Sequence, residues 1–229
     1  MRTRQYLKTG RFHQMNGQEC QDRTFVREKD GFLFAAVADG ATACSRSGTG
    51  AEIACRGAAD FFDREREQVF DYPAEKLCYL LTEHILYFLE TETGGRGEAL
   101  HDYASTILAA WIETETGRTL LVNLGDGCIL RSDGKDCDML LSPKRYHGNP
   151  CLTTTEGAYR AMELRQTVLS MREMLLLCTD GFLHFLRAEP ERLSVLAQPC
   201  GSRELASLEQ KLEASAEMDD SSYLAIWRA

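Results

Sequence analysis

Residues 32–40 read FLFAAVADG, an apolar run that ends on an aspartate and a glycine. An unbroken apolar run between two Asp-Gly turns predicts a buried strand over residues 32–38. The pattern then changes to helical spacing, and helices are predicted over residues 50–68 and 74–92. Pro73 stands just before the second helix, where helix starts favour proline. This segment therefore predicts a buried strand followed by two helices.

Short apolar runs punctuated by glycine turns follow the second helix and favour antiparallel strands. Because strands and helices come in blocks, an α+β sandwich fits the order better than alternating βαβ units. The sequence shows no repeat and no linker, so a single domain over residues 1–229 is predicted. The further predicted strands are residues 105–113, 119–125, 128–131, 162–169, 174–181 and 221–227, and the further predicted helices are residues 189–197 and 202–214.

The composition is that of an acidic globular protein. Lys and Arg number 26 against 35 Asp and Glu, which gives a net charge of −9, and 44% of the residues are hydrophobic. A general nucleic-acid binder needs clustered Lys and Arg, which this sequence lacks. No stretch reaches the roughly 20 apolar residues that a membrane span requires. Nucleic acids and membranes are therefore not expected partners, and a monomer is the expected state.

The cysteines are scattered and lie mostly within apolar runs. None forms the Cys-x-x-Cys pair that structural zinc sites and thioredoxin-like sites use. They are expected to be buried free thiols in a reducing compartment, which predicts a cytoplasmic protein. The nine are Cys20, Cys44, Cys55, Cys78, Cys128, Cys137, Cys151, Cys178 and Cys200.

Aspartates recur at the ends of the apolar strands. Asp39 follows FAAVA, Asp126 follows LLVNLG, Asp180 follows LLLCT, and the pair Asp219 and Asp220 precedes SSYLAIW. Any one Asp-Gly at a strand end is most often only a turn. Several carboxylates that converge at one edge of a sandwich would repel one another unless cations lie between them. An all-oxygen ligand set suits Mg²⁺ or Mn²⁺, so the pattern predicts a divalent metal site.

Six motifs follow one another along the chain: HQMNGQECQDR (13–23), VADGATACSRSGTGAEIA (37–54), ASTILAAW (104–111), VNLGDGCIL (122–130), LLLCTDGF (175–182) and DDSSYLAIW (219–227). In this order they resemble the motifs of the PPM family, the metal-dependent type 2C Ser/Thr protein phosphatases, and the match is nearest to the compact bacterial members. The resemblance covers residues 13–227. It implies a four-layer α-β-β-α sandwich of two antiparallel sheets flanked by helices, with metals at one edge.

Carried over residue by residue, the resemblance implies a two-metal centre. Asp39 resembles the aspartate that bridges the two metals, and the carbonyl of Gly40 resembles the backbone ligand beside it. Asp180 and Asp219 resemble the other carboxylates of the first metal. Asp220 stays open as the alternative to Asp219.

Three further residues belong to the implied site. Asp22 in CQDR looks like the aspartate that orients the attacking water. Asp126 resembles a carboxylate that helps to hold a third, more labile metal in bacterial members, although it could simply cap a hairpin. Gln21 stands where many members have glutamate, and its amide oxygen can still meet a metal or its water. The implied cofactors are two or three Mn²⁺ or Mg²⁺ ions.

The phosphate-binding arginine of many family members is absent, because Gly17 stands at its position. His13 then becomes a candidate phosphate contact, with Arg11 and Arg23 behind it. Local packing is the alternative for His13, and neither interpretation outweighs the other.

The predicted function is hydrolysis of phosphoserine or phosphothreonine in a phosphorylated protein by a water that two metal ions activate. Two alternatives remain open. Gln21 and Gly17 motivate a catalytically idle binding module on the same fold. The same site could also serve a phosphatase of small phosphorylated metabolites.

Overall fold

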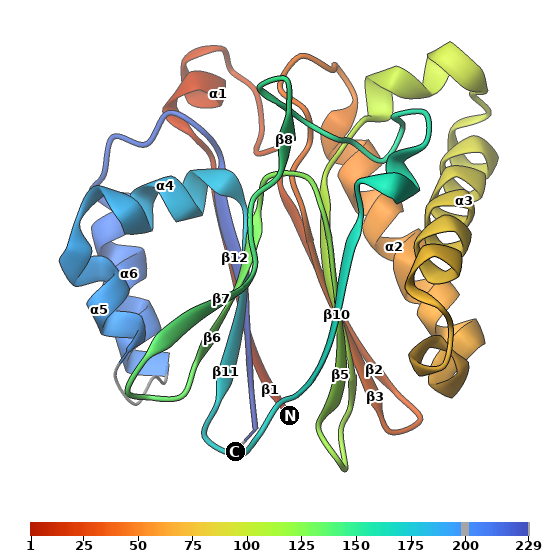
Figure 1. The fold of residues 1–229 in the computed structure, drawn as a ribbon. Helices are drawn as coiled ribbons and strands as arrows, with labels where there is room; N and C mark the ends of the chain where they lie inside the picture. The colour runs from red at the N-terminus through yellow and green to blue at the C-terminus, as the bar shows by residue number, and fades with distance from the viewer. Residues whose placement is uncertain (198–201, 229) are drawn as a thin grey trace.

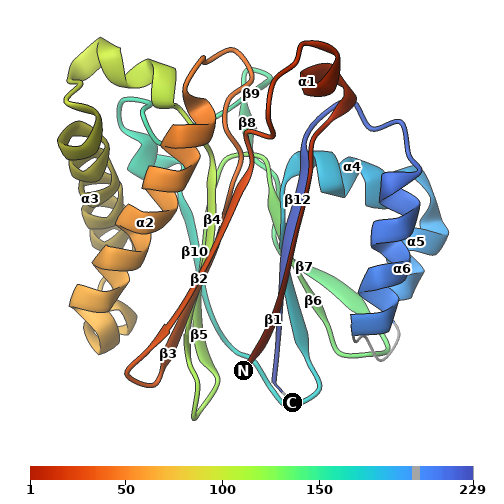
Figure 2. The same ribbon diagram turned by 180° about the vertical axis from the view of Figure 1, so that it is seen from behind.

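The computed structural model describes residues 1–197 and 202–228. Two five-stranded sheets pack face to face, and helices cover the outer face of each (Figures 1 and 2). Neighbouring strands within each sheet are antiparallel. The predicted α+β fold with four layers in the order α-β-β-α is therefore confirmed.

The first sheet, sheet I, carries the strand with which the sequence analysis begins. Phe34 of this strand lies opposite Trp111, and both rings pack against Phe62 of the covering helix, with 5.6 Å between ring centroids in each case. In sheet order the strands are β10 (Glu163–Val168), β5 (Arg118–Leu124), β4 (Ile107–Glu113), β3 (Phe32–Ala38) and β2 (Arg23–Lys29).

The second sheet, sheet II, includes both the first and the last strand of the chain. The alternate residues of β3 that face away from the helices, such as Leu33 and Val37, pack against Leu177 and Leu224 of sheet II, and all four are buried. Burying such a side chain contributes about 1.5–3 kcal/mol. In sheet order the strands are β1 (Arg2–Lys8), β12 (Ser221–Trp227), β11 (Met174–Cys178), β6 (Cys128–Ser132) and β7 (Cys137–Leu141).

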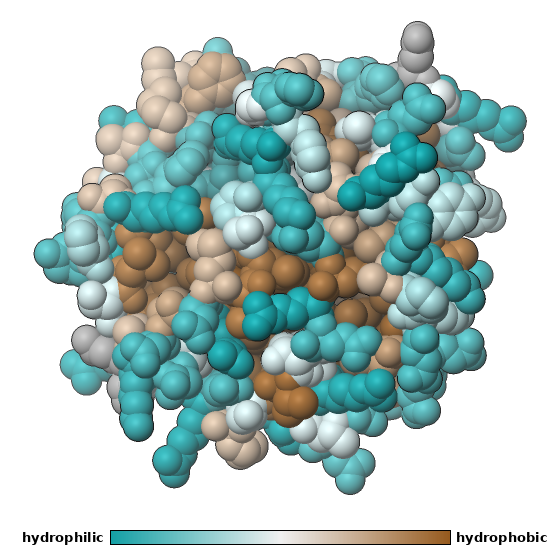
Figure 3. Space-filling model, in the orientation of Figure 1, coloured by the Kyte–Doolittle hydropathy of each residue, from teal (hydrophilic) through white to brown (hydrophobic). Residues whose placement is uncertain are grey.

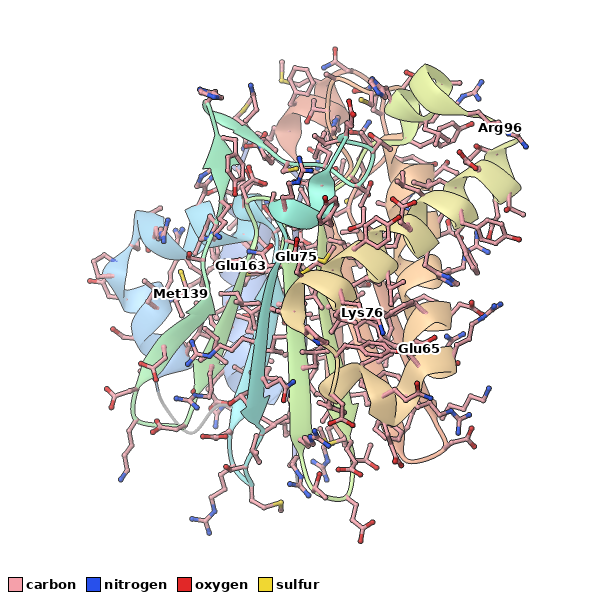
Figure 4. The ribbon with its side chains drawn as sticks, turned by 45° about the vertical axis from the view of Figure 1, so that its right-hand side comes forward. Glu65, Glu75, Lys76, Arg96, Met139 and Glu163 are labelled. Carbon is pink, nitrogen blue, oxygen red and sulfur yellow. The ribbon has the colours of Figure 1, made fainter. Side chains whose placement is uncertain are left out.

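The helices form two separate layers. A Cβ at Gly50 of α2 would lie 1.9 Å from the Tyr103 carbonyl oxygen, so glycine permits the close packing there. In Figure 4, Glu65 and Lys76 lie near each other on the outer side of the layer over sheet I. Helices α2 (Ser47–Glu65) and α3 (Ala74–Thr93) cover sheet I, and α4 (Asp180–Ala188), α5 (Pro190–Leu196) and α6 (Ser202–Glu213) cover sheet II.

Shorter elements gather at the end of the sandwich opposite the start of β1 (Figure 1). They link the sheets to the helices and surround the ends of the central strands. They are α1 (Arg11–Met15), the 3₁₀ segment η2 (Gly97–Tyr103), and a two-stranded ribbon of β8 (Arg145–Tyr146) and β9 (Asn149–Pro150). Two further 3₁₀ segments are η1 (Arg66–Phe70) and η3 (Ala158–Arg160).

Two predicted elements have wrong boundaries. The first predicted helix, residues 50–68, begins at Ser47 and ends at Glu65, where Arg66 adopts a left-handed φ of 34° and the chain tightens into η1. The strand predicted over residues 174–181 ends at Cys178, because Asp180 already begins α4. Helix α4 was not predicted, since only Thr179, Asp180 and Gly181 separate its apolar residues from those of β11, and the sequence analysis included Asp180 and Gly181 in the strand.

In the two five-stranded sheets, the strands that the sequence analysis did not predict are β1, β2 and β7, and each lies at the edge of its sheet. Edge strands carry charged side chains that oppose pairing with other chains. Accordingly β1 reads RTRQYLK and β2 reads RTFVREK. Charged residues interrupt the alternation of apolar and polar residues by which a strand is predicted.

The eight described cysteines are all free thiols, as expected. Four of them, among them Cys128 and Cys178, are buried, and the other four are half-buried. Cys200 lies outside the described residues. None of the helices in the described part of the chain combines the length and the apolar character that crossing a bilayer requires.

Candidate metal centre

Three aspartates predicted from the strand ends converge at one end of the sandwich. Asp39 follows β3 of sheet I, Asp126 lies in the turn between β5 and β6, and Asp180 follows β11 of sheet II at the start of α4. One carboxylate oxygen from each lies within 4.8 Å of the others. The topology explains this, because β3 and β5 both pair antiparallel with β4 and so end at the same edge, and β6 starts opposite the end of β11.

Burial and neighbouring negative charges raise the pKa values of two carboxylates in this cluster. Burial, and then the negative charges of Asp22 and Asp180, hold the pKa of Asp39 well above its usual range. Burial, followed by the charges of Asp126 and Asp219, raises the pKa of Asp180. Such shifts mean that the ionised carboxylates lack the counter-charge they need. The cluster is therefore a site that divalent cations would stabilise.

Asp22 lies behind this cluster with no exposed surface. Its Oδ2 accepts a hydrogen bond from the Thr179 hydroxyl at 3.0 Å, while Oδ1 has no hydrogen-bond partner among the described residues. Burial raises the pKa of Asp22 to about 7. The amide oxygen of the neighbouring Gln21 is also buried and has no hydrogen-bond partner in residues 1–197 and 202–228. These unsatisfied oxygens fit hard divalent cations and their water ligands.

Gly40 lines the cavity beside Asp39. A Cβ at this position would lie 2.8 Å from the Ser47 backbone and 3.0 Å from the Gln21 carbonyl oxygen. Glycine is thus needed to let the chain turn closely past α2, which leaves the backbone beside Asp39 open to the cavity.

The two neighbouring aspartates before β12 have different environments. Asp220 is buried, and its oxygens accept the Gly10 N–H at 2.7 Å and the Gln21 N–H at 2.5 Å. Asp219 is exposed and lines the cavity near Asp180, outside the cluster of three. Asp220 therefore serves as the acceptor for two backbone N–H groups, and Asp219 is the carboxylate open to a cation.

These environments predict that Asp220→Asn lowers the free energy of unfolding by about 2 kcal/mol, because one of two buried backbone donors loses its acceptor. Asp219→Asn, the matched control, is expected not to lower it. Urea denaturation in chelator at pH 7.5 measures both. A larger loss for Asp219→Asn than for Asp220→Asn would reverse the assignment of the two residues.

Of the predicted phosphate contacts, one reaches the cavity. His13 is buried in α1, with Nδ1 2.9 Å from Asp220 Oδ1, and its Nε2 has no hydrogen-bond partner among the described residues. Arg11 is exposed on α1, and the Arg23 guanidinium donates to the carbonyls of Cys20 and Asp22. Of these three candidates, only His13 lines the cavity.

Arg145 of β8 is a cavity residue that the sequence analysis did not identify. Its Nη2 lies 2.8 Å from Asp126 Oδ2 and 3.1 Å from Asp180 Oδ2. Residues 142–150 read SPKRYHGNP, a polar loop in which nothing distinguishes this arginine from a surface residue. Thr106 and Asn149 also line the cavity and were not predicted.

The cavity has a volume of about 470 Å³ and opens at the end where α1 and β8 lie. Its walls combine the acidic cluster with small residues of the loop after β3, including Ala41 and Thr42. Apolar surface stands nearby over α1, where Phe12 and Met15 are exposed (Figure 3). The acidic cluster therefore lines a cavity that has exposed apolar side chains of α1 nearby.

Comparisons with solved structures show the same fold in known phosphatases. The fold matches a bacterial serine phosphatase at 12% identity with a TM-score of 0.72, covering 98% of this chain and 96% of that one. It matches the serine/threonine phosphatase Stp1 from Staphylococcus aureus at 12% identity with a TM-score of 0.73, covering 100% and 95%. RsbX in complex with magnesium matches at 16% identity with a TM-score of 0.62, covering 97% and 92%.

No curated protein matches the sequence of this chain. The family model described as protein phosphatase 2C matches residues 9–215, which include every residue of the acidic cluster. With the model spanning most of the chain and the shared fold spanning nearly all of it, the chain belongs to the protein phosphatase 2C family.

Proposed function

We propose that this metal-dependent Ser/Thr phosphatase acts on phosphorylated proteins and hydrolyses phosphoserine or phosphothreonine with two Mg²⁺ or Mn²⁺ ions. The observation that carries the proposal is the convergence of Asp39, Asp126 and Asp180, each of which offers a carboxylate oxygen within 4.8 Å of the others. Asp39, Asp180 and Asp219, with the Gly40 carbonyl, would hold the two ions, and Asp126 would help to hold a third. Gln21 would contact them through its amide oxygen or a water.

When bound, the cations would activate water for in-line attack at phosphorus and neutralise the phosphoryl oxygens. Asp22 Oδ1, which lacks a hydrogen-bond partner within the described part of the chain, would accept a hydrogen bond from the attacking water, while the Thr179 hydroxyl donates to Oδ2. His13 Nδ1 lies 2.9 Å from Asp220 Oδ1, and His13, which lines the cavity, would contact the phosphate. These residues orient the nucleophile and the substrate, and no covalent intermediate is required.

The choice of magnesium or manganese rests on the all-oxygen character of the site. RsbX, a protein of the same fold, was solved with magnesium, which supports magnesium as a ligand here. An idle module would gain nothing from repelling buried carboxylates, because each one that lacks a counter-charge opposes folding. The retained cluster therefore favours an enzyme over an idle binding module.

Phosphate release from a phosphothreonine peptide, with Mg²⁺, Mn²⁺ or chelator, tests the proposal. We expect turnover with a metal and none in chelator, because the carboxylates alone repel the phosphate dianion. A sugar phosphate at equal concentration is the comparison substrate. Faster turnover of the sugar phosphate would identify a metabolite phosphatase, and calorimetry showing no binding of either metal would favour the idle module.

A further inference from the structure

Arg145 is the one arginine that lines the cavity in the described part of the chain. It is about half exposed, and its only partners among the described residues are Asp126 and Asp180, both reached through Nη2. Its Nη1 and Nε have no partner there and carry three N–H donors between them. The guanidinium thus contacts the carboxylates through one nitrogen, and the N–H groups of its other two nitrogens are free to donate to a ligand.

The loop that carries Arg145 is fixed at several points. The backbone N–H of Lys144 donates to the Gly125 carbonyl at 2.9 Å, next to Asp126. The Lys144 side chain pairs with Glu163 of β10 at 2.7 Å, and Asn123 donates to the Ser142 carbonyl at 2.9 Å. Glu163 is the first residue of β10, and its side chain is labelled in Figure 4. These contacts fix the position of the loop and so place Arg145 next to the acidic cluster.

A phosphate dianion entering a cluster of carboxylates needs positive charge on the side that the cations do not cover. A guanidinium supplies that charge in a planar fork that matches two phosphate oxygens. With Gly17 in the place of the family's arginine, and with Arg11 and Arg23 outside the cavity, the sequence offers no other arginine for this task within the described residues.

We propose that Arg145 binds the phosphate of the substrate through the N–H groups of its guanidinium that Asp126 and Asp180 leave free. The inference rests on the proposed function and deepens it, because it moves the phosphate-binding arginine from the start of the chain to the β8 loop. It also makes Arg145 a competitor of the cations, since Nη2 occupies carboxylate oxygens that a metal would use.

The experiment compares Arg145→Ala and Arg145→Lys with the control Arg160→Ala, which removes the same charge from an exposed position of η3 outside the cavity. We expect Arg145→Ala to raise KM for the phosphopeptide about 10- to 100-fold with a smaller change in kcat, as loss of a charge-assisted contact implies. Arg145→Lys should recover part of the loss, because it restores the charge but not the fork. Arg160→Ala should behave like wild type.

Two binding measurements by calorimetry complete the test without using activity. The dissociation constant of Mg²⁺-loaded protein for inorganic phosphate should rise in Arg145→Ala by about the same 10- to 100-fold factor. Mg²⁺ itself should bind Arg145→Ala more tightly than wild type, because the competing guanidinium is gone.

The inference is overturned if wild type turns over the phosphopeptide while Arg145→Ala leaves both KM and phosphate affinity unchanged. Tighter Mg²⁺ binding together with an unchanged KM would likewise reject it, since Arg145 would then serve only to balance the carboxylates. If wild type releases no phosphate from any ester but still binds inorganic phosphate through Arg145, the proposed function fails and the inference stands.

Discussion

Asp39→Asn is expected to lower kcat/KM by at least about a thousandfold, which corresponds to about 4 kcal/mol of transition-state stabilisation. Asp39 follows β3 of sheet I, and one of its carboxylate oxygens lies within 4.8 Å of oxygens of both Asp126 and Asp180. An amide at this position has half the oxygen ligands and no charge, so it would hold a divalent cation far less well. Steady-state kinetics with saturating Mg²⁺ or Mn²⁺ measure the loss.

The same variant is expected to be more stable than wild type in chelator, because the mutation removes a carboxylate whose pKa is raised by burial and by its neighbours. Opposite changes in activity and stability distinguish a metal ligand from a residue that only supports the fold. Asp71→Asn is the control, since Asp71 is 85% exposed and lies outside the cavity. Full metal-dependent activity in Asp39→Asn would refute the assignment of the site.

The acidic cluster could be predicted because its residues share a local signal. Asp39, Asp126 and Asp180 each follow an apolar strand, and strands of one sandwich end at common edges. The fold could be predicted from the same central strands, because their apolar runs are long enough to be recognised in the sequence. The edge strands β1, β2 and β7 lacked that signal because charge interrupts their alternation.

Residues that act through distant partners could not be found in this way. Arg145 reaches Asp180 across 35 positions of sequence, and Asp220 reaches Gly10 across 210. Neither contact leaves a periodic pattern, because each depends on how two loops meet after the sheets have packed. The sequence therefore left Asp219 and Asp220 as alternatives, whereas their burial separates them.

The stability of the metal-free protein should depend on the ionisation of Asp22. Burial raises its pKa in the folded chain to about 7, against 3.8 for an ordinary aspartate. The folded state thus binds this proton more tightly than the unfolded state. Its stabilising contribution is complete below pH 3.8 and is lost as the pH rises through about 7.

Asp22→Asn removes this titration and keeps an oxygen that can accept the Thr179 hydroxyl. The free energy of unfolding of the variant, minus that of wild type, is therefore expected to grow by about 4 kcal/mol between pH 4 and pH 8, since each pKa unit corresponds to about 1.4 kcal/mol. Urea denaturation in chelator at several pH values measures this difference. Subtracting wild type cancels the titration of the many exposed carboxylates.

The matched control is Asp138→Asn, because Asp138 is 63% exposed and lies far from the cluster in β7. Its difference from wild type should stay nearly constant over the same range of pH. Cations bound at the centre would favour the ionised form of Asp22, so saturating Mg²⁺ should reduce the pH dependence of the Asp22→Asn difference. A difference curve for Asp22→Asn as flat as that of Asp138→Asn would mean that Asp22 ionises in the folded chain as it does in water, and that it cannot be the buried carboxylate that orients the attacking water.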